Sequence, residues 1–318
     1  MRTDVVAVIV TYYSAGHIEE CLRSLRGVAE IVVVDNGSKD GTREIVRRTA
    51  PAATLIVNSS NRGFAGAVNQ GIAATHSPLV LLLNPDSYLR TPLHAMVEAC
   101  LRARGGAAGG KLVDAEGEPQ QGFNVRALPT ATALAAECLG LNRMWPSNRV
   151  NRRYRRFDLD PDQSQDVEQP AGAFLMVRRD VLESIGYLDD AFYPLWFEDV
   201  DLCWRILRSG YKIRYTPECE ARHDGGHSVP AMTVEQRHLA WYGNLIRFVD
   251  KHFSVWTRRW LRPVILVGIL GRWLATWGAG NREKRRAYTK ALRLVVGGRQ
   301  LTLPAASGSA DNSSVVQF

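Results

Sequence analysis

Residues 79–86 read Leu79-Val80-Leu81-Leu82-Leu83-Asn84-Pro85-Asp86, and this stretch decides the fold. Five apolar residues followed by turn residues predict a strand that is buried on both faces of a sheet. Pro85 has no N–H to give to a neighbouring strand, so the strand ends at Asn84 and Asp86 projects from its carboxyl end. Ligands of open α/β sheets bind at that edge, where carboxylate and amide oxygens suit a divalent cation on a diphosphate. The alternative is an ordinary turn in which Asp86 binds its own backbone.

Three more strands are predicted upstream, and helical patterns alternate with them. Short apolar runs predict these strands at residues 4–11, 29–34 and 54–57. The alternation predicts a parallel, doubly wound sheet, in which the carboxyl ends of the strands share one edge. Thr11 and Asp35 end the first two strands. We therefore expect both side chains to line one pocket together with Asp86.

The middle of the chain carries weaker signals. Thr91 and Pro92 predict a helix start with Thr91 as its N-cap, and the glycines of residues 105–110 predict its end. Residues 142–156 hold six arginines among Asn, Ser and Pro and predict a long mobile loop. That loop is either solvated surface or a clamp that binds phosphates through charge-assisted hydrogen bonds. Helical spacing at residues 197–209 predicts a helix with three carboxylates in its first turn.

Length and cysteine usage bound the class of the protein. The 318 residues are 46% hydrophobic, which is enough for one large α/β domain or two moderate ones. The five cysteines are scattered, odd in number and without a CxxC pair. This pattern argues against a zinc site or a disulfide framework and favours a reducing compartment.

The positive charge is concentrated near the C-terminal end. Residues 241–300 hold 13 Lys/Arg against 2 Asp/Glu, and they contain five of the eight tryptophans. Basic residues interleaved with Trp fit an anionic membrane surface better than a nucleic acid groove, although a basic stretch alone does not separate the two. The apolar run 263–278 contains Arg272 and is shorter than the roughly 20 residues that span a bilayer. We expect an interfacial or hairpin-like attachment, with a buried core helix as the alternative.

Several short motifs follow one another along the chain. They are Val10-Thr11-Tyr12, Val34-Asp35-Asn36-Gly37-Ser38, Asn61–Asn69, Asn84-Pro85-Asp86, Glu198-Asp199-x-Asp201 and His223-x-Gly-Gly-x-Ser228. In this order and spacing they resemble the family 2 inverting glycosyltransferases with the GT-A fold. Within that family, the Asn-Pro-Asp motif, the Trp-Phe-Glu-Asp-Val-Asp-Leu stretch at 196–202 and the basic C-terminal region are most similar to bacterial rhamnosyltransferases. One such group acts on polyprenyl-diphosphate-linked N-acetylglucosamine.

The resemblance implies an α/β fold of the GT-A type. It has a mostly parallel central sheet flanked by helices, followed by a helical, basic C-terminal region. Residues 1–115 are then the half that binds the nucleotide sugar, and residues 116–234 are the half that binds the acceptor and carries the catalytic helix. Residues 235–303 are a Trp-rich helical region associated with the membrane, and residues 304–318, rich in small polar residues, are expected to be a disordered tail.

The resemblance also implies a set of substrate-binding residues at the strand ends, the glycine-rich helix start and the later loops. They are Thr11, Tyr12, Asp35, Asn36, Asn61, Gly63, Phe64, Gly66, Asn69, Asn84, Gly172, Ala173, Trp196 and His223. Of these, Thr11, Tyr12 and Asp35 would hold the nucleobase and ribose. Gly63 and Gly66 would let the backbone approach the nucleotide closely.

A divalent cation, Mg²⁺ or Mn²⁺, is implied at the diphosphate. Asp86 would bind it, with Asn84 nearby and His223 as a contact of the metal or the diphosphate. Two positions depart from the family pattern: Tyr13 stands where many relatives have Asn, and Asn84-Pro85-Asp86 replaces a common Asp-x-Asp. The second departure leaves one certain carboxylate at the metal.

The catalytic candidates are Asp199 and Glu198. An acceptor hydroxyl needs a general base within hydrogen-bond reach, and one base opposite the leaving group gives inversion. The resemblance assigns this role to Asp199, with Glu198 able to orient the acceptor and His227 as the other candidate base. Asp201 lies nearly opposite Asp199 on the helix, so we expect it to bond an arginine such as Arg205.

These observations lead to one function and three alternatives. The leading prediction is a metal-dependent hexosyltransferase that moves L-rhamnose from dTDP-L-rhamnose to a polyprenyl-diphosphate-linked acceptor. It would be cytoplasmic, peripherally attached to the inner face of the plasma membrane, and without a nucleic acid partner. The alternatives are a transferase of another nucleotide sugar such as a UDP-sugar, a metal-dependent nucleotidyltransferase, and a basic binding module without chemistry. A nucleotidyltransferase has a Gly-rich signature with Lys or Arg immediately after its first strand. This chain has Thr11-Tyr-Tyr-Ser there instead, which counts against a nucleotidyltransferase.

Overall fold

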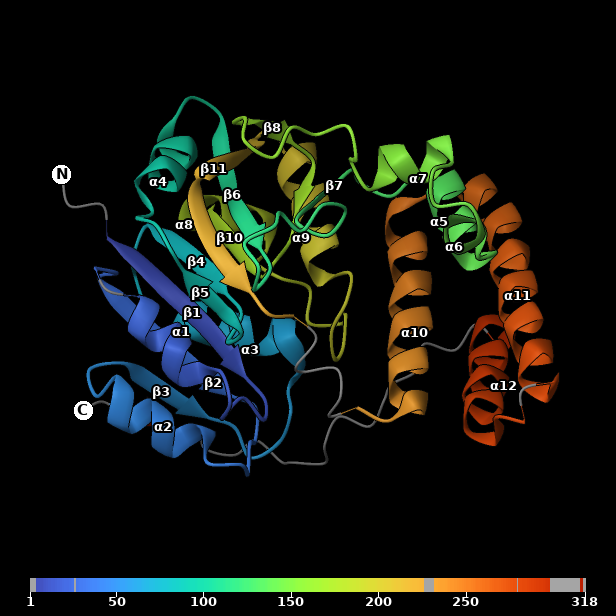
Figure 1. Cartoon of the computed structure of the whole chain (residues 1–318), viewed down its shortest axis with the longest axis horizontal. Coiled ribbons are helices and arrows are strands. Elements are labelled where there is room, and N and C mark those ends of the chain that lie inside the picture. Colours follow the sequence, from blue (N-terminus) through green and yellow to red (C-terminus); the bar gives the residue numbers. More distant parts are fainter. Residues whose placement is uncertain (1–3, 26, 226–231, 279, 298–314, 317–318) are drawn as a thin grey trace.

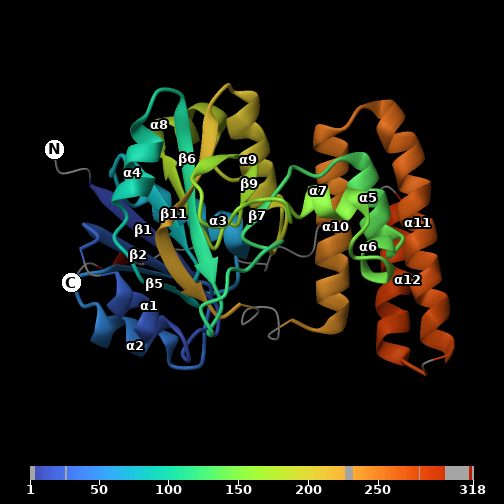
Figure 2. The ribbon, with the colours of Figure 1, turned by 45° about the horizontal axis from the view of Figure 1, so that its top comes forward.

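A computed structural model describes residues 4–25, 27–225, 232–278, 280–297 and 315–316 of the chain. It consists of a large sheet covered by helices on both faces and a group of helices beside it (Figure 1). Figure 2 shows the same two parts after a turn of 45°, with the C-terminal helices at one side of the sheet domain. This arrangement is the predicted α/β fold with a helical C-terminal region.

The N-terminal part of the sheet is parallel, as predicted. Its strands are β1 (Val5–Thr11), β2 (Glu30–Asp35), β3 (Thr54–Val57) and β4 (Leu79–Leu83). They lie in the order β3-β2-β1-β4, and β1 pairs with both β2 and β4. Thr11 pairs in register with Asp35, so the polar ends of the strands do share one edge.

Strand β4 is buried along its whole length. Leu79, Leu81 and Leu83 pack into one core, and Val80 and Leu82 pack into the core on the opposite face. The first core is covered by α1 (Ile18–Ser24), α2 (Thr42–Thr49) and α4 (His94–Leu101). The second is covered by α3 (Gly63–Ala73), α8 (Arg179–Ile185) and α9 (Glu198–Arg208). Each fully buried side chain of this size contributes about 1.5–3 kcal/mol, which fixes the strand between the layers.

The second part of the sheet is mixed. Its strands are β5 (Ser87–Leu89), β6 (Gly105–Val113), β8 (Gln165–Val167), β10 (Phe174–Arg178) and β11 (Lys212–His223). The order continues β4-β10-β6-β11-β5, with β10 antiparallel to both of its neighbours and β8 paired to β11. A separate two-stranded sheet joins β7 (Val125–Arg126) to β9 (Gln169–Pro170). Strand β10 thus joins the two parts of the sheet. The carboxyl end of β11 pairs with β5, which follows β4 in the chain.

Two predicted features near residue 100 are wrong. Residues 105–110 do not end a helix but form most of β6, because their small size admits bulky neighbours: a Cβ on Gly110 would lie 2.0 Å from Cε1 of Phe174. Thr91 is not an N-cap either, since α4 begins at His94 with Leu93 in the cap position. The Thr91 hydroxyl instead accepts a hydrogen bond from the Glu220 N–H at 2.7 Å and ties the loop to β11.

The arginine-rich segment is also more ordered than predicted. Residues 142–156 do not form one long loop but belong largely to two short helices, α6 (Leu141–Met144) and α7 (Arg149–Tyr154). Asn148 caps α7 by accepting from the Asn151 N–H at 2.8 Å. The buried Asn151 amide in turn donates to the Pro146 carbonyl at 2.7 Å. These local bonds satisfy the backbone that a mobile loop would leave to water.

The remaining helices form a bundle with its own core. They are α5 (Ala131–Cys138), α10 (Val234–His252), α11 (Val255–Gly278) and α12 (Arg282–Gly297). Leu245, Phe248, Ile265, Ile269 and Ala291 are among the residues buried between them. The run 263–278 is therefore half core and half surface, since Val267, Leu270 and Leu274 of the same helix stay exposed. In the described part of the chain no helix is long and apolar enough to cross a membrane.

The predicted tail of residues 304–318 lies mostly outside the described residues. Val315 and Val316 alone are described there, and they pair with β3 as β12.

Candidate active site

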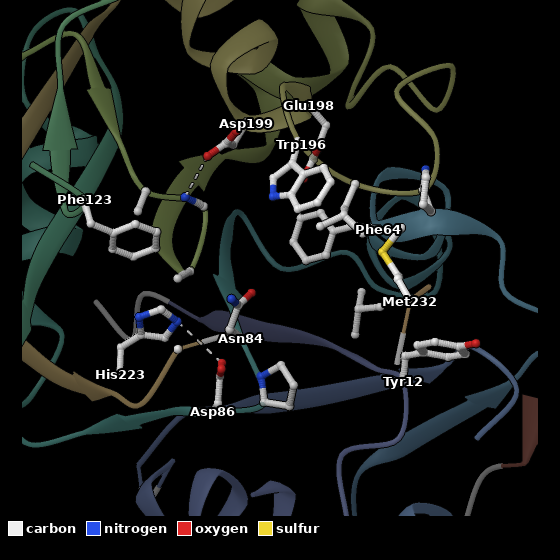
Figure 3. A pocket seen from close by; sticks show the side chains of 18 of the residues that line it. Tyr12, Phe64, Asn84, Asp86, Phe123, Trp196, Glu198, Asp199, His223 and Met232 are labelled. Atoms are coloured by element: carbon white, nitrogen blue, oxygen red, sulfur yellow. Dashed lines mark hydrogen bonds and ion pairs between the residues drawn. The ribbon is translucent and has the colours of Figure 1, made fainter. Parts of the chain in front are cut away.

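A cavity of about 780 Å³ opens at the carboxyl ends of β1 and β4, between the sheet and the start of α9. Figure 3 shows Glu198 and Asp199 on one side of it and Asp86 and His223 on the other. Among the residues that line it are most of the predicted site residues, namely Tyr12, Asn36, Asn61, Phe64, Asn84, Asp86, Gly172, Ala173, Trp196, Glu198, Asp199 and His223. The structure thus brings together segments that are more than 200 residues apart.

Asp35 and Thr11 lie behind the cavity wall rather than on it. The Thr11 hydroxyl donates to Asp35 Oδ1 at 3.0 Å, and both side chains are fully buried. Asp35 Oδ2 accepts from the Ser38 N–H at 3.0 Å and from Arg43 Nε at 2.7 Å. The carboxylate therefore organises the loop after β2, which carries Asn36 into the cavity lining.

Three predicted residues of α3 are likewise not among the described residues that line the cavity: Gly63, Gly66 and Asn69. The Asn69 amide donates to the Leu188 carbonyl at 2.8 Å and accepts from the Leu188 N–H at 3.2 Å, which occupies both of its ends. Gly63 has φ 77°, and a Cβ there would lie 2.8 Å from Cδ2 of Tyr193. Glycine is thus needed for the loop at residues 187–196, which contains Tyr193 and precedes α9, to pack closely over the start of α3.

Asp86 and His223 meet because β5 pairs with β11. Ser87 lies opposite His223 in this register, and His223 Nε2 is 3.6 Å from Asp86 Oδ1. The His223 ring stacks on Phe123 at 5.2 Å, and its Nδ1 lies 3.0 Å from Oε1 of Gln120. The Gln120 amide also donates to the His223 carbonyl at 2.6 Å. A carboxylate oxygen and a held imidazole nitrogen consequently face the same corner of the cavity.

This corner fits a divalent cation only in part. Carboxylate and imidazole are both ligands of Mn²⁺, and Mg²⁺ is commonly bound through one or two carboxylates with substrate phosphates completing its shell. Across the residues that the structure describes, no group of three or more His, Cys, Asp or Glu side chains is arranged to hold a metal. The protein's donors are thus Asp86 and His223, and a cation there would need oxygens from a diphosphate.

Asp199 is held at the start of α9 by backbone donors. Its Oδ1 accepts from the Val200 N–H at 2.8 Å, and its Oδ2 accepts from the Gly172 N–H and from Gln169 Nε2, each at 3.3 Å. A Cβ on residue 172 would lie 3.0 Å from Cβ of Asp199, so glycine there permits this approach. Burial raises the pKa of Asp199, while the N–H groups of Gly172 and Val200 oppose the rise.

Glu198 behaves differently although it is the next residue. Burial, and secondly the charge of Asp199, raise the pKa of Glu198 well above its ordinary value. Its Oε2 is buried without a hydrogen-bond partner among the described groups. Two adjacent carboxyls in a poorly solvated site do not both ionise readily. The backbone donors favour the charged form of Asp199, whereas burial and the charge of Asp199 favour the neutral form of Glu198.

The helix that carries both residues is tied down from its other face. Asp201 is fully buried, and its carboxylate accepts from Arg205 Nε at 2.8 Å, which confirms the predicted bond. Lys251 Nζ lies 2.8 Å from the same carboxylate, and His252 Nε2 lies 2.7 Å from it. Burial raises the pKa of Asp201, but the hydrogen bonds from His252 and Lys251 outweigh it, so the pKa is lowered. The bundle thus holds the helix that begins with Glu198 and Asp199.

Several lining residues were not predicted from the sequence. They are Val10, Pro85, Gln120, Phe123, Arg126, Gln169, Ala171, Tyr193, Pro194, Leu195, Gly225, Met232 and Gln236. Gln120, Arg126 and Gln169 are isolated polar residues in segments without periodicity, and no local pattern marks them. The cluster of aromatic residues in the loop at 187–196, just before α9, is a signal in the sequence that could have marked Tyr193 and its neighbours. His227, the other candidate base, lies outside the described residues.

Comparisons with known sequences give one family and several relatives. A model of the family described as Glycosyl transferase family 2 matches residues 6–186. The N-acetylglucosaminyl-diphospho-decaprenol L-rhamnosyltransferase of Mycobacterium tuberculosis is 30% identical over 316 residues, which cover 93% of this chain and 99% of that protein. The low-salt glycan biosynthesis hexosyltransferase Agl10 of Haloferax volcanii is 27% identical over 70% of this chain and 68% of its own.

Solved structures share the fold. A mannosyltransferase from Pyrobaculum calidifontis in complex with GDP-Man and Mn²⁺ aligns with a TM-score of 0.53 and 18% identity, covering 94% of this chain and 86% of its own. TarS residues 1–349 of S. aureus, in complex with UDP-GlcNAc, aligns with a TM-score of 0.52 and 16% identity over 92% of this chain and 80% of its own. At such identities the likeness concerns the fold alone.

Proposed function

Because the chain belongs to glycosyl transferase family 2, we propose that it moves L-rhamnose from dTDP-L-rhamnose to a polyprenyl-diphosphate-linked N-acetylglucosamine. The relative that supports this substrate pair matches the chain over nearly its full length. The observation that carries the proposal is the arrangement of Asp199 across one cavity from Asp86 and His223. Residues 1–115 would bind the donor, residues 116–234 the acceptor, and residues 235–303 the membrane.

Asp199 acts as the general base in this proposal. It accepts the proton of the acceptor hydroxyl while the hydroxyl oxygen bonds to the anomeric carbon and the bond from that carbon to the nucleoside diphosphate breaks. One attack from the face opposite the leaving group inverts the anomeric centre. By contrast, glycoside hydrolases use two carboxylates that flank the glycosidic bond being broken. Glu198, whose pKa is raised by burial and by the charge of Asp199, would orient the acceptor rather than accept its proton.

Asp86 and His223 would hold a divalent cation at the donor diphosphate. When bound, such an ion stabilises the negative charge that develops on the leaving oxygens. The mannosyltransferase of Pyrobaculum calidifontis, which shares the fold, was determined with Mn²⁺, and this supports a divalent cation in the proposal. Gln120 and Phe123 keep the imidazole of His223 in place, so the protein's part is to orient these two ligands.

Peripheral attachment to an anionic membrane would bring the lipid-linked acceptor to the cavity. Trp256 and Trp277 are 74% and 58% exposed, and each has an arginine over its ring, Arg259 at 5.0 Å and Arg285 at 4.2 Å. Exposed Trp beside Arg suits the boundary between lipid headgroups and acyl chains. A cytoplasmic location on the inner face of the plasma membrane follows in this proposal from a nucleotide-sugar donor.

The experiment combines donor screening with product analysis. Purified protein is incubated with Mn²⁺, a detergent-dispersed farnesyl-diphosphate-linked N-acetylglucosamine, and either dTDP-L-rhamnose or a UDP-sugar. We expect mass spectrometry to show one added deoxyhexose from the dTDP-sugar, and NMR to show an inverted anomeric centre. Transfer from a UDP-sugar alone would replace the donor assignment, and retention of configuration would contradict the role of Asp199.

A further inference from the structure

A second, basic cavity lies beside the first one. It has a volume of about 460 Å³ and is lined by Ala127, Arg149, Arg152, Arg153, Arg156, Asp158 and Glu168. The two cavities are separated by the small sheet of β7 and β9. In that sheet Arg126 pairs with Gln169, and both line the main cavity, whereas the next residues outward, Ala127 and Glu168, line the basic one. The basic cavity therefore begins one residue beyond the side of the active site that holds Asp199 through Gln169.

Three of the four arginines belong to α7, and Arg156 lies two residues beyond its end. The Ala127 N–H donates to the Tyr154 carbonyl at 2.9 Å, which attaches the end of α7 to the end of β7. Arg155 donates through Nη1 to the Gly122 carbonyl at 3.3 Å and through Nε to Asn151 Oδ1 at 3.2 Å. Together with the Asn148 cap, these bonds hold the helix at the rim of the active-site cavity. The position of its arginines is thus set by the sheet.

The charges of this cavity are not balanced. Arg149, Arg152 and Arg153 are exposed and form no ion pair within the described part of the chain. Arg156 alone of the four has a carboxylate partner, Asp158, at 3.4 Å from its Nε. The Glu168 carboxylate is engaged by the Leu128 N–H at 2.6 Å. Four guanidinium groups against two carboxylates leave a positive site, and guanidinium forks match phosphate oxygens in pairs.

We propose that Arg149, Arg152, Arg153 and Arg156 bind the diphosphate of the lipid-linked acceptor. The proposal rests on the proposed function, because it takes the sugar next to this diphosphate to be the one whose hydroxyl faces Asp199. The polyprenyl chain of the acceptor would extend from the basic cavity toward the surface just before α7, where Met144 and Trp145 are 73% and 66% exposed. The donor diphosphate is bound elsewhere, at Asp86 and His223, so the enzyme separates its two diphosphates on two sides of the cavity.

The first test is direct binding, which needs no turnover. Farnesyl diphosphate is titrated into the full chain by calorimetry with EDTA present, so that no cation draws it to Asp86. The double variant Arg152→Gln, Arg153→Gln should bind about tenfold more weakly, since each lost charge-assisted hydrogen bond costs affinity. Arg47→Gln with Arg208→Gln removes two exposed arginines that have no ion pair in the described residues, and it should bind as the wild type does. Equal affinity of all three proteins would overturn the site.

The second test separates this site from the proposed function and from lipid headgroups. With a phosphate-free alkyl N-acetylglucosaminide as acceptor, the Arg152→Gln, Arg153→Gln variant should keep its kcat and KM. With the farnesyl-diphosphate-linked acceptor, its KM should rise about tenfold at constant kcat and constant donor KM. An equal rise for both acceptors overturns recognition of the diphosphate. Loss of binding to phosphatidylglycerol vesicles without loss of farnesyl diphosphate affinity would instead assign the arginines to the membrane and also overturn the proposal.

Discussion

The carboxylate of Asp201 lies 2.7 Å from Nε2 of His252, and this contact joins α9, which begins with Glu198 and Asp199, to α10 of the helical bundle. Trp204 of the same helix packs on the His252 ring at 4.9 Å. The bundle therefore also supports the helix that carries Glu198 and Asp199. The position of the bundle and the position of the candidate base Asp199 are therefore linked through α9.

His252→Ala should weaken both stability and turnover. The substitution leaves the buried Asp201 carboxylate with Arg205 and Lys251 only, and the lost bond to a charged group costs about 1–3 kcal/mol. We expect a lower urea midpoint and a lower kcat with an unchanged affinity for the nucleotide. His238→Ala is the matched control on the same helix. Its Nδ1 lies 2.7 Å from the Val234 carbonyl of α10, and its ring packs on the Tyr288 ring rather than on α9. Equal loss of kcat in both variants would argue against a specific link.

Asp199→Asn should lower kcat by roughly 10²–10⁴-fold, the usual contribution of a general base. The amide keeps the size of the side chain, and its one oxygen can accept from either the Val200 or the Gly172 N–H, which bind different oxygens of Asp199. Donor binding should hardly change, because the proposal assigns the donor diphosphate to Asp86 and His223. Steady-state kinetics and calorimetry with dTDP check the two parts. Near-normal turnover of Asp199→Asn, together with loss of turnover in His227→Ala, would transfer the role to His227.

Glu198→Gln should stabilise the protein at alkaline pH. A carboxyl whose pKa is raised in the folded state binds its proton more tightly there than in the unfolded chain. Folding stability that is fully present below the unfolded pKa of about 4.3 is then lost as pH rises toward the folded pKa. Gln at this position lacks this loss, so the difference in Tm between variant and wild type should grow from pH 5 to pH 8. A difference that stays constant with pH would mean that Glu198 is not held protonated.

The pH dependence of activity should have an acidic limb set by Asp199. Burial raises the pKa of this carboxyl, and the base works only when it is ionised, so kcat should fall as pH drops through the raised pKa. The profile of kcat between pH 4.5 and 9 checks this with saturating donor and Mn²⁺. In Asp199→Asn the residual rate should lose this limb. A limb that persists unchanged in the variant belongs to another group.

Asp86→Ala should abolish nucleotide binding that depends on Mn²⁺ and leave the fold intact. The carboxylate sits in the turn after β4, and its neighbour Ser87 stays paired to His223 through the backbone. Titration calorimetry with dTDP, with and without Mn²⁺, measures the effect. Glu116→Ala, which removes an exposed carboxylate that is not among the residues lining the cavity, is the control. An Asp86→Ala protein with wild-type affinity in Mn²⁺ contradicts the metal assignment.

Binding to vesicles should depend on the exposed face of α11. Truncation near residue 255 is not a clean test, because Leu261, Ile265 and Ile269 are core residues of the bundle. The double variant Trp256→Ser, Trp277→Ser leaves that core untouched. It should co-sediment less with phosphatidylglycerol vesicles, and recovery of the wild type should fall as salt rises. Equal recovery of the wild type with neutral and anionic vesicles would refute the electrostatic part.

The sequence by itself determined the parts of this protein that depend on local pattern. The apolar run of residues 79–83 followed by Asn84-Pro85-Asp86 was sufficient for a central strand with a carboxylate at its end, because burial and the missing N–H of proline act on neighbouring residues. The bond between Asp201 and Arg205 was predictable for the same reason, since residues four apart on a helix face each other.

Only the tertiary structure decided which distant residues meet. The proximity of His223 to Asp86 follows from the register of β5 with β11, and the contact of His252 with Asp201 follows from how the bundle packs on α9. The glycines of residues 105–110 became a strand because Phe174 needs the space. Burial raises the pKa of both Glu198 and Asp199, and the N–H groups of Gly172 and Val200 oppose the rise at Asp199. Long-range pairing and burial are properties of the folded chain, and no local pattern encodes them.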